Sequence, residues 1–337
     1  MKRLKYIVAA LALMVLSSCV YENPTYIPAG VKLRLSFILD KSVADMYPEM
    51  SDVTNKDYDI RYVIKAYRMT NQGGYHNVPH KQFVVTKNNI SSLDSTVLVE
   101  LDEGQYKFYA LADYVPQWEV QDKFYNTQSF ADLYQFTDPY KGNTDAKTLF
   151  VGSKDVNVHV FSGEETYTDT ISLTPALSKY QIVATDLQEF YKSRTGRSDI
   201  NDELVGIHVK DYKVKVRYSD TDPLYTHMNM IKGNVPTRGE TGIWFESKIS
   251  KLNETEAMLC FDHIMLGDTQ HEITVRVGIY DKLGKHVTTV PVKFPPQKGR
   301  LTCVKGAFLT YVGLENPEDG GVVVDPGFNG DFTTESN

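Results

Sequence analysis

The chain has 337 residues, with 36 Lys and Arg against 43 Asp and Glu and a formal net charge of −7. This balance argues against binding to nucleic acid and against electrostatic docking on anionic lipid, because both would repel an acidic protein. Aromatic residues make up 12% of the sequence, and the 22 Tyr and 15 Phe favour strands over helices. The composition therefore predicts a β-rich protein without a nucleic-acid partner.

The first nineteen residues have the pattern of an export signal. Three basic residues lie within positions 2–5, and an uninterrupted apolar run covers positions 6–16. The run ends in the small-residue segment Leu16-Ser17-Ser18-Cys19. It has about eleven residues, whereas a membrane-spanning helix needs about twenty, so we expect a cleaved signal peptide rather than a permanent span.

The segment Leu16-Ser17-Ser18-Cys19 resembles the bacterial lipoprotein box, in which cleavage occurs before a lipid-modified cysteine. The resemblance implies removal of residues 1–18 and acylation of Cys19; the alternative is an ordinary secretory signal that has a cysteine near its cleavage site. Cleavage removes three basic residues and no acidic one, which leaves 319 residues with a net charge of −10. A lipoprotein cysteine carries a thioether-linked diacylglycerol and an N-acyl chain, and two such signals suffice for stable anchoring. We therefore expect acylated Cys19 to hold the chain on the lipid bilayer.

The length of the mature chain predicts two domains, since 319 residues exceed what one hydrophobic core usually serves. Residues 19–30 contain two prolines and a glycine and show no periodicity, so we expect a tether there. Pro175 cannot donate a ladder hydrogen bond and marks the predicted boundary. The sequence therefore predicts an N-terminal β-sandwich over 31–174, a C-terminal β-sandwich over 175–315 and a flexible tail over 316–337.

Alternation of apolar and polar residues predicts many short strands, which favours a sandwich or a barrel within each unit. The number of strands favours two sandwiches in tandem. One short helix is expected over 186–194, with Thr185 and Gln188 as a capping box and Gly196 at its end. The predicted strands cover 31–37, 61–68, 83–86, 96–101, 106–114, 148–151, 156–161 and 168–173, then 180–184, 207–218, 243–248, 257–264, 272–280, 286–294 and 301–311.

The strand pattern stops between residues 115 and 147, where the chain is polar but rich in aromatic residues. A loop of this length is often functional. One interpretation is that the aromatic rings fix the loop to the wall of the sandwich. The other is a ligand surface in which Trp118, Tyr125, Tyr134 and Tyr140 stack on sugar rings. Exposed and coplanar rings would favour the second interpretation.

The sequence offers no pattern of catalytic or metal-binding chemistry. The eight histidines have no metal-site spacing, and neither a phosphate loop nor a nucleophile motif is present. Cys260 and Cys303 lie in apolar strand patterns, which we interpret as two buried free thiols, with a single disulfide as the alternative. The sequence therefore predicts a protein that is not an enzyme and has no cofactor and no metal site.

Several segments together resemble Bacteroidales fimbrillin-type lipoproteins, in particular one uncharacterised branch of that family. The resemblance implies two tandem transthyretin-like or immunoglobulin-like β-sandwich domains and export to the outer membrane. It also implies a structural, tip or anchoring role in surface fimbriae, or a fimbria-like adhesin, with other fimbrial subunits as partners. The segments are 31–39, 61–67, 104–106 and 112–114 for the first domain, 123–127 and 139–145 for the aromatic loop, and 178–190 and 291–310 for the second domain.

The role within that family stays open. In polymerising members a protease removes the first strand at a basic residue; here Arg61 follows the first strand, on an expected loop with Asp57 and Asp59. A permanently tethered anchor and a shaft subunit are both compatible with the sequence. The alternative function is a cell-surface glycan-binding lipoprotein that uses the aromatic stretch 115–140. Either would lie on the surface or the periplasmic face of the outer membrane.

Two short motifs suggest glycosylation. Asp94-Ser95-Thr96 and Asp169-Thr170-Ile171 resemble the O-glycosylation sequon of this phylum, which makes Ser95 and Thr170 candidate sites. The alternative is two ordinary strand edges, since a motif this short occurs by chance. In the tail, Val322–Val324 has strand propensity between two glycine-containing breaks, so we expect it to pair with an edge of its own domain or of a neighbour.

Overall fold

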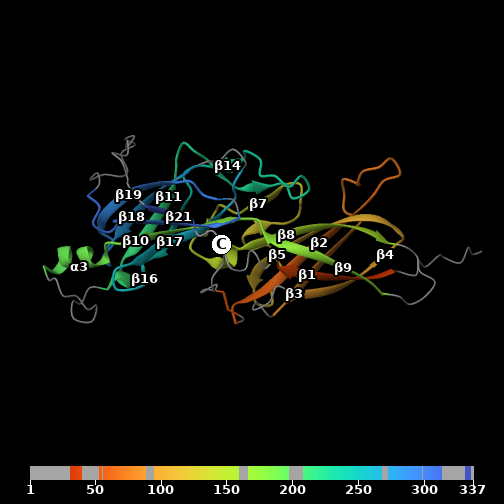
Figure 1. Cartoon of the computed structure of the whole chain (residues 1–337), viewed down its shortest axis with the longest axis horizontal. Helices are drawn as coiled ribbons and strands as arrows, with labels where there is room; N and C mark the ends of the chain where they lie inside the picture. The colour runs from red at the N-terminus through yellow and green to blue at the C-terminus, as the bar shows by residue number, and fades with distance from the viewer. Residues whose placement is uncertain are drawn as a thin grey trace, which may run out of the picture.

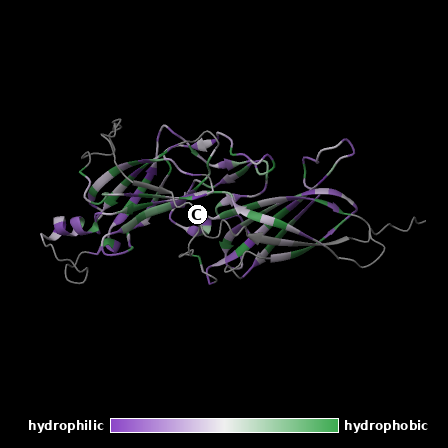
Figure 2. Cartoon of the chain, in the orientation of Figure 1, coloured by the Kyte–Doolittle hydropathy of each residue, from purple (hydrophilic) through white to green (hydrophobic). Residues whose placement is uncertain are grey.

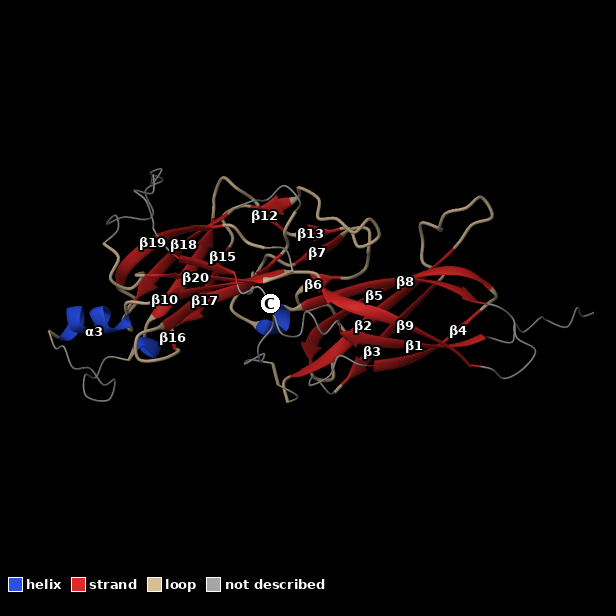
Figure 3. Ribbon diagram, viewed as in Figure 1, coloured by secondary structure: helices blue, strands red, loops and turns tan. Residues whose placement is uncertain are grey.

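The computed structural model describes residues 31–39, 53–54, 56–88, 95–158, 166–196, 208–267, 272–297, 299–312 and 331–334. These residues form an elongated molecule in which two groups of β-sheets lie one after the other along the long axis (Figure 1). Strands dominate both groups, and one α-helix is present in the described residues (Figure 3). The predicted all-β architecture with one short helix is therefore confirmed.

The first sandwich is formed by one seven-stranded sheet that folds into two layers. The layers are joined where β8 pairs with β9 at Phe150–Pro175 and Val151–Thr174. Strand β1 lies between β9, to which it is parallel, and β4, to which it is antiparallel. The first layer contains β3 (Lys81–Lys87), β2 (Tyr58–Arg68), β5 (Gly104–Pro116) and β8 (Leu149–Val158), and the second contains β9 (Thr166–Pro175), β1 (Val31–Leu39) and β4 (Ser95–Leu101).

The core of this sandwich follows from two-residue alternation. In β4, Val97, Val99 and Leu101 are buried, whereas the residues between them are exposed. They pack in one cluster with buried residues of the opposite layer such as Tyr62 and Phe108. Figure 2 shows the same alternation of hydrophobic and hydrophilic residues along the strands. The alternation read from the sequence thus fixes which face of each strand is buried.

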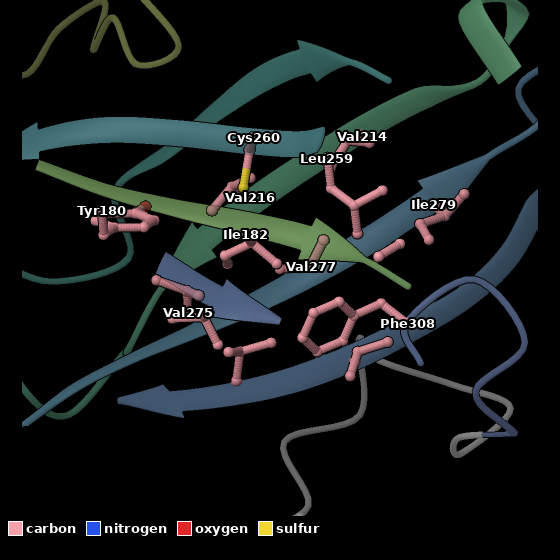
Figure 4. Packing of buried hydrophobic residues seen from close by; sticks show 14 of the residues in the cluster. Tyr180, Ile182, Val214, Val216, Leu259, Cys260, Val275, Val277, Ile279 and Phe308 are labelled. Atoms are coloured by element: carbon pink, nitrogen blue, oxygen red, sulfur yellow. The ribbon is translucent and has the colours of Figure 1, made fainter. Parts of the chain in front are cut away.

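The second sandwich has one five-stranded and one four-stranded sheet. Figure 4 shows side chains from both sheets meeting in the core, among them Ile182, Val216 and Val277. The five-stranded sheet contains β16 (Ser250–Lys251), β17 (Ala257–Ile264), β10 (Ser178–Ala184), β20 (Leu301–Gly306) and β21 (Asp331–Thr334). The four-stranded sheet contains β15 (Trp244–Lys248), β11 (Lys213–Tyr218), β18 (Ile273–Tyr280) and β19 (His286–Phe294).

The helix α3 (Leu187–Thr195) lies where the sequence predicts it and ends at Gly196 in the left-handed conformation, with φ of 69°. The predicted capping box is wrong. Asp186 is the N-cap residue, and its carboxylate accepts hydrogen bonds from the backbone N–H groups of Leu309 and Thr310 rather than from the helix. Gln188 instead donates to the carbonyl of Glu254. Tertiary partners therefore replaced the local cap.

Two further expectations differ from the structure, and a third is not tested by it. The predicted strands 148–151 and 156–161 are parts of the single strand β8. The predicted strand 207–218 begins only at Lys213, after the short 3-10 helix η2 (Val209–Asp211). In the tail, Val322–Val324 lies outside the described residues, and the strand that is described, β21, pairs antiparallel with β20 of its own sandwich.

The two strand cysteines are free thiols, as the sequence predicts. Cys260 on β17 and Cys303 on β20 lie on opposite sides of β10, where they face Ile182 and Gln181. Two strand spacings separate their Cα atoms by about 9.5 Å, which exceeds the roughly 7 Å limit for a disulfide. Because Ile182 and Gln181 are consecutive residues, the two thiols also point to opposite faces of the sheet.

Candidate functional site

The aromatic loop after β5 lies between the two sandwiches and forms the central site of the molecule. It contains β6 (Tyr125–Asn126), β7 (Leu133–Gln135) and the 3-10 helix η1 (Asp145–Lys147). Of the four predicted ligand residues, Tyr125 and Tyr140 are buried, Tyr134 is half-buried and Trp118 is 83% exposed. The structure therefore does not bring these four rings together on one exposed surface. The two buried rings belong to an internal contact.

A buried ion pair lies at the centre of this contact. Lys147 Nζ of the loop is 2.6 Å from Asp262 Oδ1 of β17, and both side chains are at most 1% exposed. The other carboxylate oxygen of Asp262 accepts hydrogen bonds from the hydroxyl groups of Tyr140 at 2.6 Å and Tyr218 at 2.7 Å. The ammonium of Lys147 also lies over the Tyr140 ring, 4.3 Å from its centroid. Residues about 115 positions apart in sequence thus share one charge-neutral cluster.

Burial determines the protonation of the cluster. It raises the pKa of Tyr140 and of Tyr218 well above 10, so both hydroxyl groups stay protonated and donate to Asp262. Burial lowers the pKa of Lys147, and the adjacent Asp262 offsets part of that effect. The hydroxyl groups and the ammonium are therefore donors that converge on one carboxylate.

A second ion pair lies beside the first. Asp145 Oδ1 of η1 is 2.5 Å from Lys179 Nζ of β10 and 3.0 Å from His263 Nε2 of β17. Burial lowers the pKa of His263, which favours the neutral imidazole. Burial alone would raise the pKa of Asp145, but the hydrogen bond from His263 and the charge of Lys179 hold it below the ordinary value. Sequence separation concealed both pairs: Asp145 and Lys147 are neighbours in η1, but their partners Lys179 and Asp262 lie 34 and 115 positions further along the chain.

The backbone of the loop fits closely against the second sandwich. Gly142 lies against the ring of Phe245, so a Cβ atom at position 142 would be 2.5 Å from the ring. Asn143 adopts φ of 54°, donates its N–H to the carbonyl of Phe261 at 3.0 Å and accepts the N–H of Phe261 at its side-chain oxygen. Asparagine is one of the few residues that tolerate this conformation.

A small bridging sheet makes a second contact between the two halves of the chain. In it β7 pairs with β6 and with β13 (His227–Met228), which belongs to the loop between β11 and β15. Leu133 lies opposite Met228, and His227 Nδ1 is 2.9 Å from Asp132 Oδ1. Since backbone pairing fixes register, this sheet restricts sliding and rotation of the two sandwiches.

Cationic side chains hold the loop on the first sandwich. Arg61 of β2 forms hydrogen bonds with Asp113 through Nε at 2.9 Å and Nη2 at 2.6 Å, and with Asp122 at 2.8 Å. Lys65 Nζ donates to the carbonyls of Thr127 and Gln128. The expectation that Arg61 lies on a loop is wrong: it lies within β2 and is only 2% exposed, so the folded chain does not present it to a protease.

The remaining predicted residues are not gathered at this junction. Ser95 begins β4 and Thr170 lies within β9, and both are partly exposed. Their glycosylation stays a prediction. Cys19 lies outside the described residues. Within the part of the chain that the structure describes, no group of three or more His, Cys, Asp or Glu residues could hold a metal ion, and no helix is long and apolar enough to span a membrane.

Solved structures similar to this chain include three proteins of fimbriae or adhesion. The fimbrial anchor protein Mfa2 from Porphyromonas gingivalis has 10% identity and a TM-score of 0.41, with 81% of this chain and 90% of that chain covered. The tip fimbrial protein Mfa3 from the same organism has 10% identity and a TM-score of 0.42, covering 82% and 94%. A candidate cell adhesion protein from Bacteroides eggerthii has 13% identity and a TM-score of 0.41, covering 91% and 95%.

A comparison with curated proteins found no match. The profile of one protein family, by contrast, matches residues 26–337, which is more than nine-tenths of the chain. This match includes both sandwiches, the aromatic loop between them and the tail. The chain therefore belongs to the family described as "Family of unknown function (DUF6562)".

Proposed function

We propose that this protein is a non-enzymatic lipoprotein of the outer membrane, anchored through Cys19, which serves as a structural, anchoring or adhesive part of a fimbria-like surface assembly. The observation that carries the proposal is the junction. Its buried charges, Lys147 with Asp262 and Lys179 with Asp145, are paired with one another between the aromatic loop and the second sandwich. Charges paired in this way fix the relative placement of the parts of the molecule and are not arranged to act on a substrate.

The junction suits a protein that must keep its shape under tension. A buried ion pair contributes little net stability compared with apolar residues of the same volume, but removing one partner costs roughly 3–5 kcal/mol. The cluster therefore favours one relative placement of the sandwiches and penalises others. A rigid unit of this kind transmits force along the molecule, which a surface subunit or an anchor requires.

The membrane part of the proposal rests on the sequence. The segment Leu16-Ser17-Ser18-Cys19 supplies the lipid site, and the resemblance to fimbrillin-type lipoproteins supplies the assembly. The alternative function, glycan binding through residues 115–140, lacks an exposed set of rings, because Tyr125 and Tyr140 are buried at 0% and 7% exposure.

The test is metabolic labelling with a radioactive fatty acid in the native host, followed by membrane fractionation. The native chain should be labelled and should sediment with outer membrane, whereas Cys19→Ala should lose both properties. Cys303→Ala is the matched control, because its buried thiol cannot accept lipid in the folded chain. Equal labelling of the native chain and the Cys19→Ala variant would contradict the proposal.

A further inference from the structure

We propose that the outer face of the sheet β15-β11-β18-β19 binds an acidic polysaccharide. The face is unusual because it is cationic on an acidic protein. Six cations have exposed or partly exposed side chains on it, whereas Glu246 lies on the same face opposite Lys215, and Asp220, Asp222 and Glu272 lie at its edge, where Glu272 pairs with Lys293 at 2.6 Å. The cations are Lys213, Lys215, Arg217, Lys248, Arg276 and Lys293.

The strand register places like charges directly opposite one another. Lys213 of β11 faces Lys248 of β15, and Arg217 of β11 faces Arg276 of β18. Such cross-strand pairs are destabilising unless an anion lies between them. For the two arginines this anion is Asp220, which forms ion pairs with Arg217 at 2.9 Å and with Arg276 at 3.9 Å. In the described residues, no ion pair involves Lys213 or Lys248, so an external anion would relieve their repulsion.

Aromatic rings accompany these cations. Trp244, at one corner of the face, is 48% exposed, and Lys215 Nζ lies 4.3 Å from the centroid of its ring. Tyr280 is partly exposed beside Lys213, and its ring extends over Gly278, where a Cβ atom would be 3.2 Å from it. From Trp244 to Lys248 the face extends about 13 Å along β15, which is more than one sugar ring. Charged groups with flat apolar rings are suited to a polymer of acidic sugars.

A hollow beside Trp244 favours a sugar over a nucleic acid. It has a volume of about 510 Å³ and is lined by residues 137–142 and 240–246. Its lining includes the carboxylates of Asp138, Glu240 and Glu246, which accept hydrogen bonds from hydroxyl groups and repel phosphate, carboxylate and sulfate alike, so an uncharged, hydroxyl-rich sugar unit suits the hollow. A hydroxyl-rich sugar unit then occupies the hollow against Trp244, while carboxylate or sulfate groups of the polymer lie over Lys213 and Lys248; Lys215, which faces Glu246 and lies over the Trp244 ring, supports the ring.

Affinity electrophoresis of the full-length protein in mild detergent tests this inference. The gels contain polygalacturonate, dextran sulfate or neutral dextran, with a single-stranded oligonucleotide as a competitor. Polygalacturonate or dextran sulfate should retard the protein and neutral dextran should not, and the arm with the stronger effect identifies the acidic group. Added salt should weaken the retardation, because exposed charges are screened.

Matched variants assign the binding to this face. Replacing both Lys213 and Lys248 by Gln should weaken binding about tenfold or more, since two charge-assisted contacts are lost. Replacing Lys56 and Lys123 by Gln changes the net charge equally on the first sandwich and should have little effect. Trp244→Ala should weaken retardation, whereas Trp118→Ala, at a more exposed tryptophan, should not.

The double Lys→Gln variant should keep the melting temperature of the native protein, because the substitution removes a like-charge contact. Weaker binding would then not result from unfolding. Three results would overturn the inference: no retardation by either acidic polymer, equal loss in the Lys56 and Lys123 control, or competition by the oligonucleotide at lower concentration than polygalacturonate. The inference rests on the proposed function only for its location outside the cell, and purified protein tests it independently of lipidation.

Discussion

Removal of the Lys147 ammonium tests the junction directly. In Lys147→Met, the Asp262 carboxylate stays buried at 0% side-chain exposure and loses its cation. It keeps three donors: the hydroxyl groups of Tyr140 and Tyr218, and the backbone N–H of His263 at 2.8 Å. Because these donors still solvate the charge, we expect the free energy of unfolding to fall by about 3 kcal/mol, the low end of the range for breaking a buried pair.

The complementary change, Asp262→Asn, leaves the Lys147 ammonium with the Tyr140 hydroxyl at 3.0 Å as its remaining side-chain partner at the junction. We expect a loss of about 3–5 kcal/mol for this variant. The double variant, Lys147→Met with Asp262→Asn, contains no buried charge at this position. The drop in its free energy of unfolding should therefore be smaller than the sum of the two single drops, by about 2 kcal/mol or more.

Urea unfolding at neutral pH, followed by fluorescence and circular dichroism, measures these losses. The control is Lys154→Met, which removes a partly exposed ion pair with Asp169 at 3.3 Å and should cost less than about 1 kcal/mol. Additive single losses, within about 0.5 kcal/mol, would show that the two residues do not interact as described. A Lys147→Met loss as small as that of the control would refute the reasoning for the whole junction.

Three further predictions concern packing, protons and thiols. Gly142→Ala places a Cβ atom against the Phe245 ring and should lower the free energy of unfolding by about 1–3 kcal/mol in urea titrations; an unchanged midpoint would contradict the close contact. Burial lowers the folded-state pKa of His263 below 6.5, and the hydrogen bond from His263 and the charge of Lys179 hold the pKa of Asp145 below 3.8. The unfolded chain therefore binds more protons than the folded chain at acidic pH. The free energy of unfolding should accordingly fall as the pH drops below about 6.5. His263→Gln should remove the upper part of this loss, and an unchanged pH profile would exclude His263 as its source. The two strand thiols should be unreactive in the folded protein, and a denatured sample from membranes should show two reactive thiols; three would mean that Cys19 is unmodified.

Strand positions could be predicted well because each strand carries its own signal. Alternation in β4 and β11 fixes the buried face from a few neighbouring residues, and the buried pattern follows it. The failures occur where tertiary contacts replace local ones. Asp186 satisfies the N–H groups of Leu309 and Thr310, which are more than 120 residues away, so the local capping box does not form.

The junction could not be predicted for the same reason. Tyr140 and Lys147 read as parts of a polar loop, since burial by a distant sandwich leaves no periodic trace in a sequence. The aromatic content did mark the loop as important and predicted that its rings could fix it in place. It did not show that the partner surface is the second sandwich, with Asp262 at its centre.

The predicted boundary near Pro175 stays a proposal. β9 ends at Pro175 and β10 begins at Ser178, as a boundary there requires. The cores, however, exchange residues across it: Tyr140 belongs to the second hydrophobic cluster, and Met228 and Met265 belong to the first. We therefore propose that each sandwich has its own core but needs the other for full stability.

Crosslinking on intact cells of the native host, followed by mass spectrometry of the attached proteins, tests the proposed function most directly. The account predicts that a membrane-impermeant crosslinker joins the chain to other surface subunits in a high-mass assembly, and that Cys19→Ala abolishes these products. Recovery of the native chain as an uncrosslinked species, with its lysines unmodified until the outer membrane is opened, would contradict a surface role.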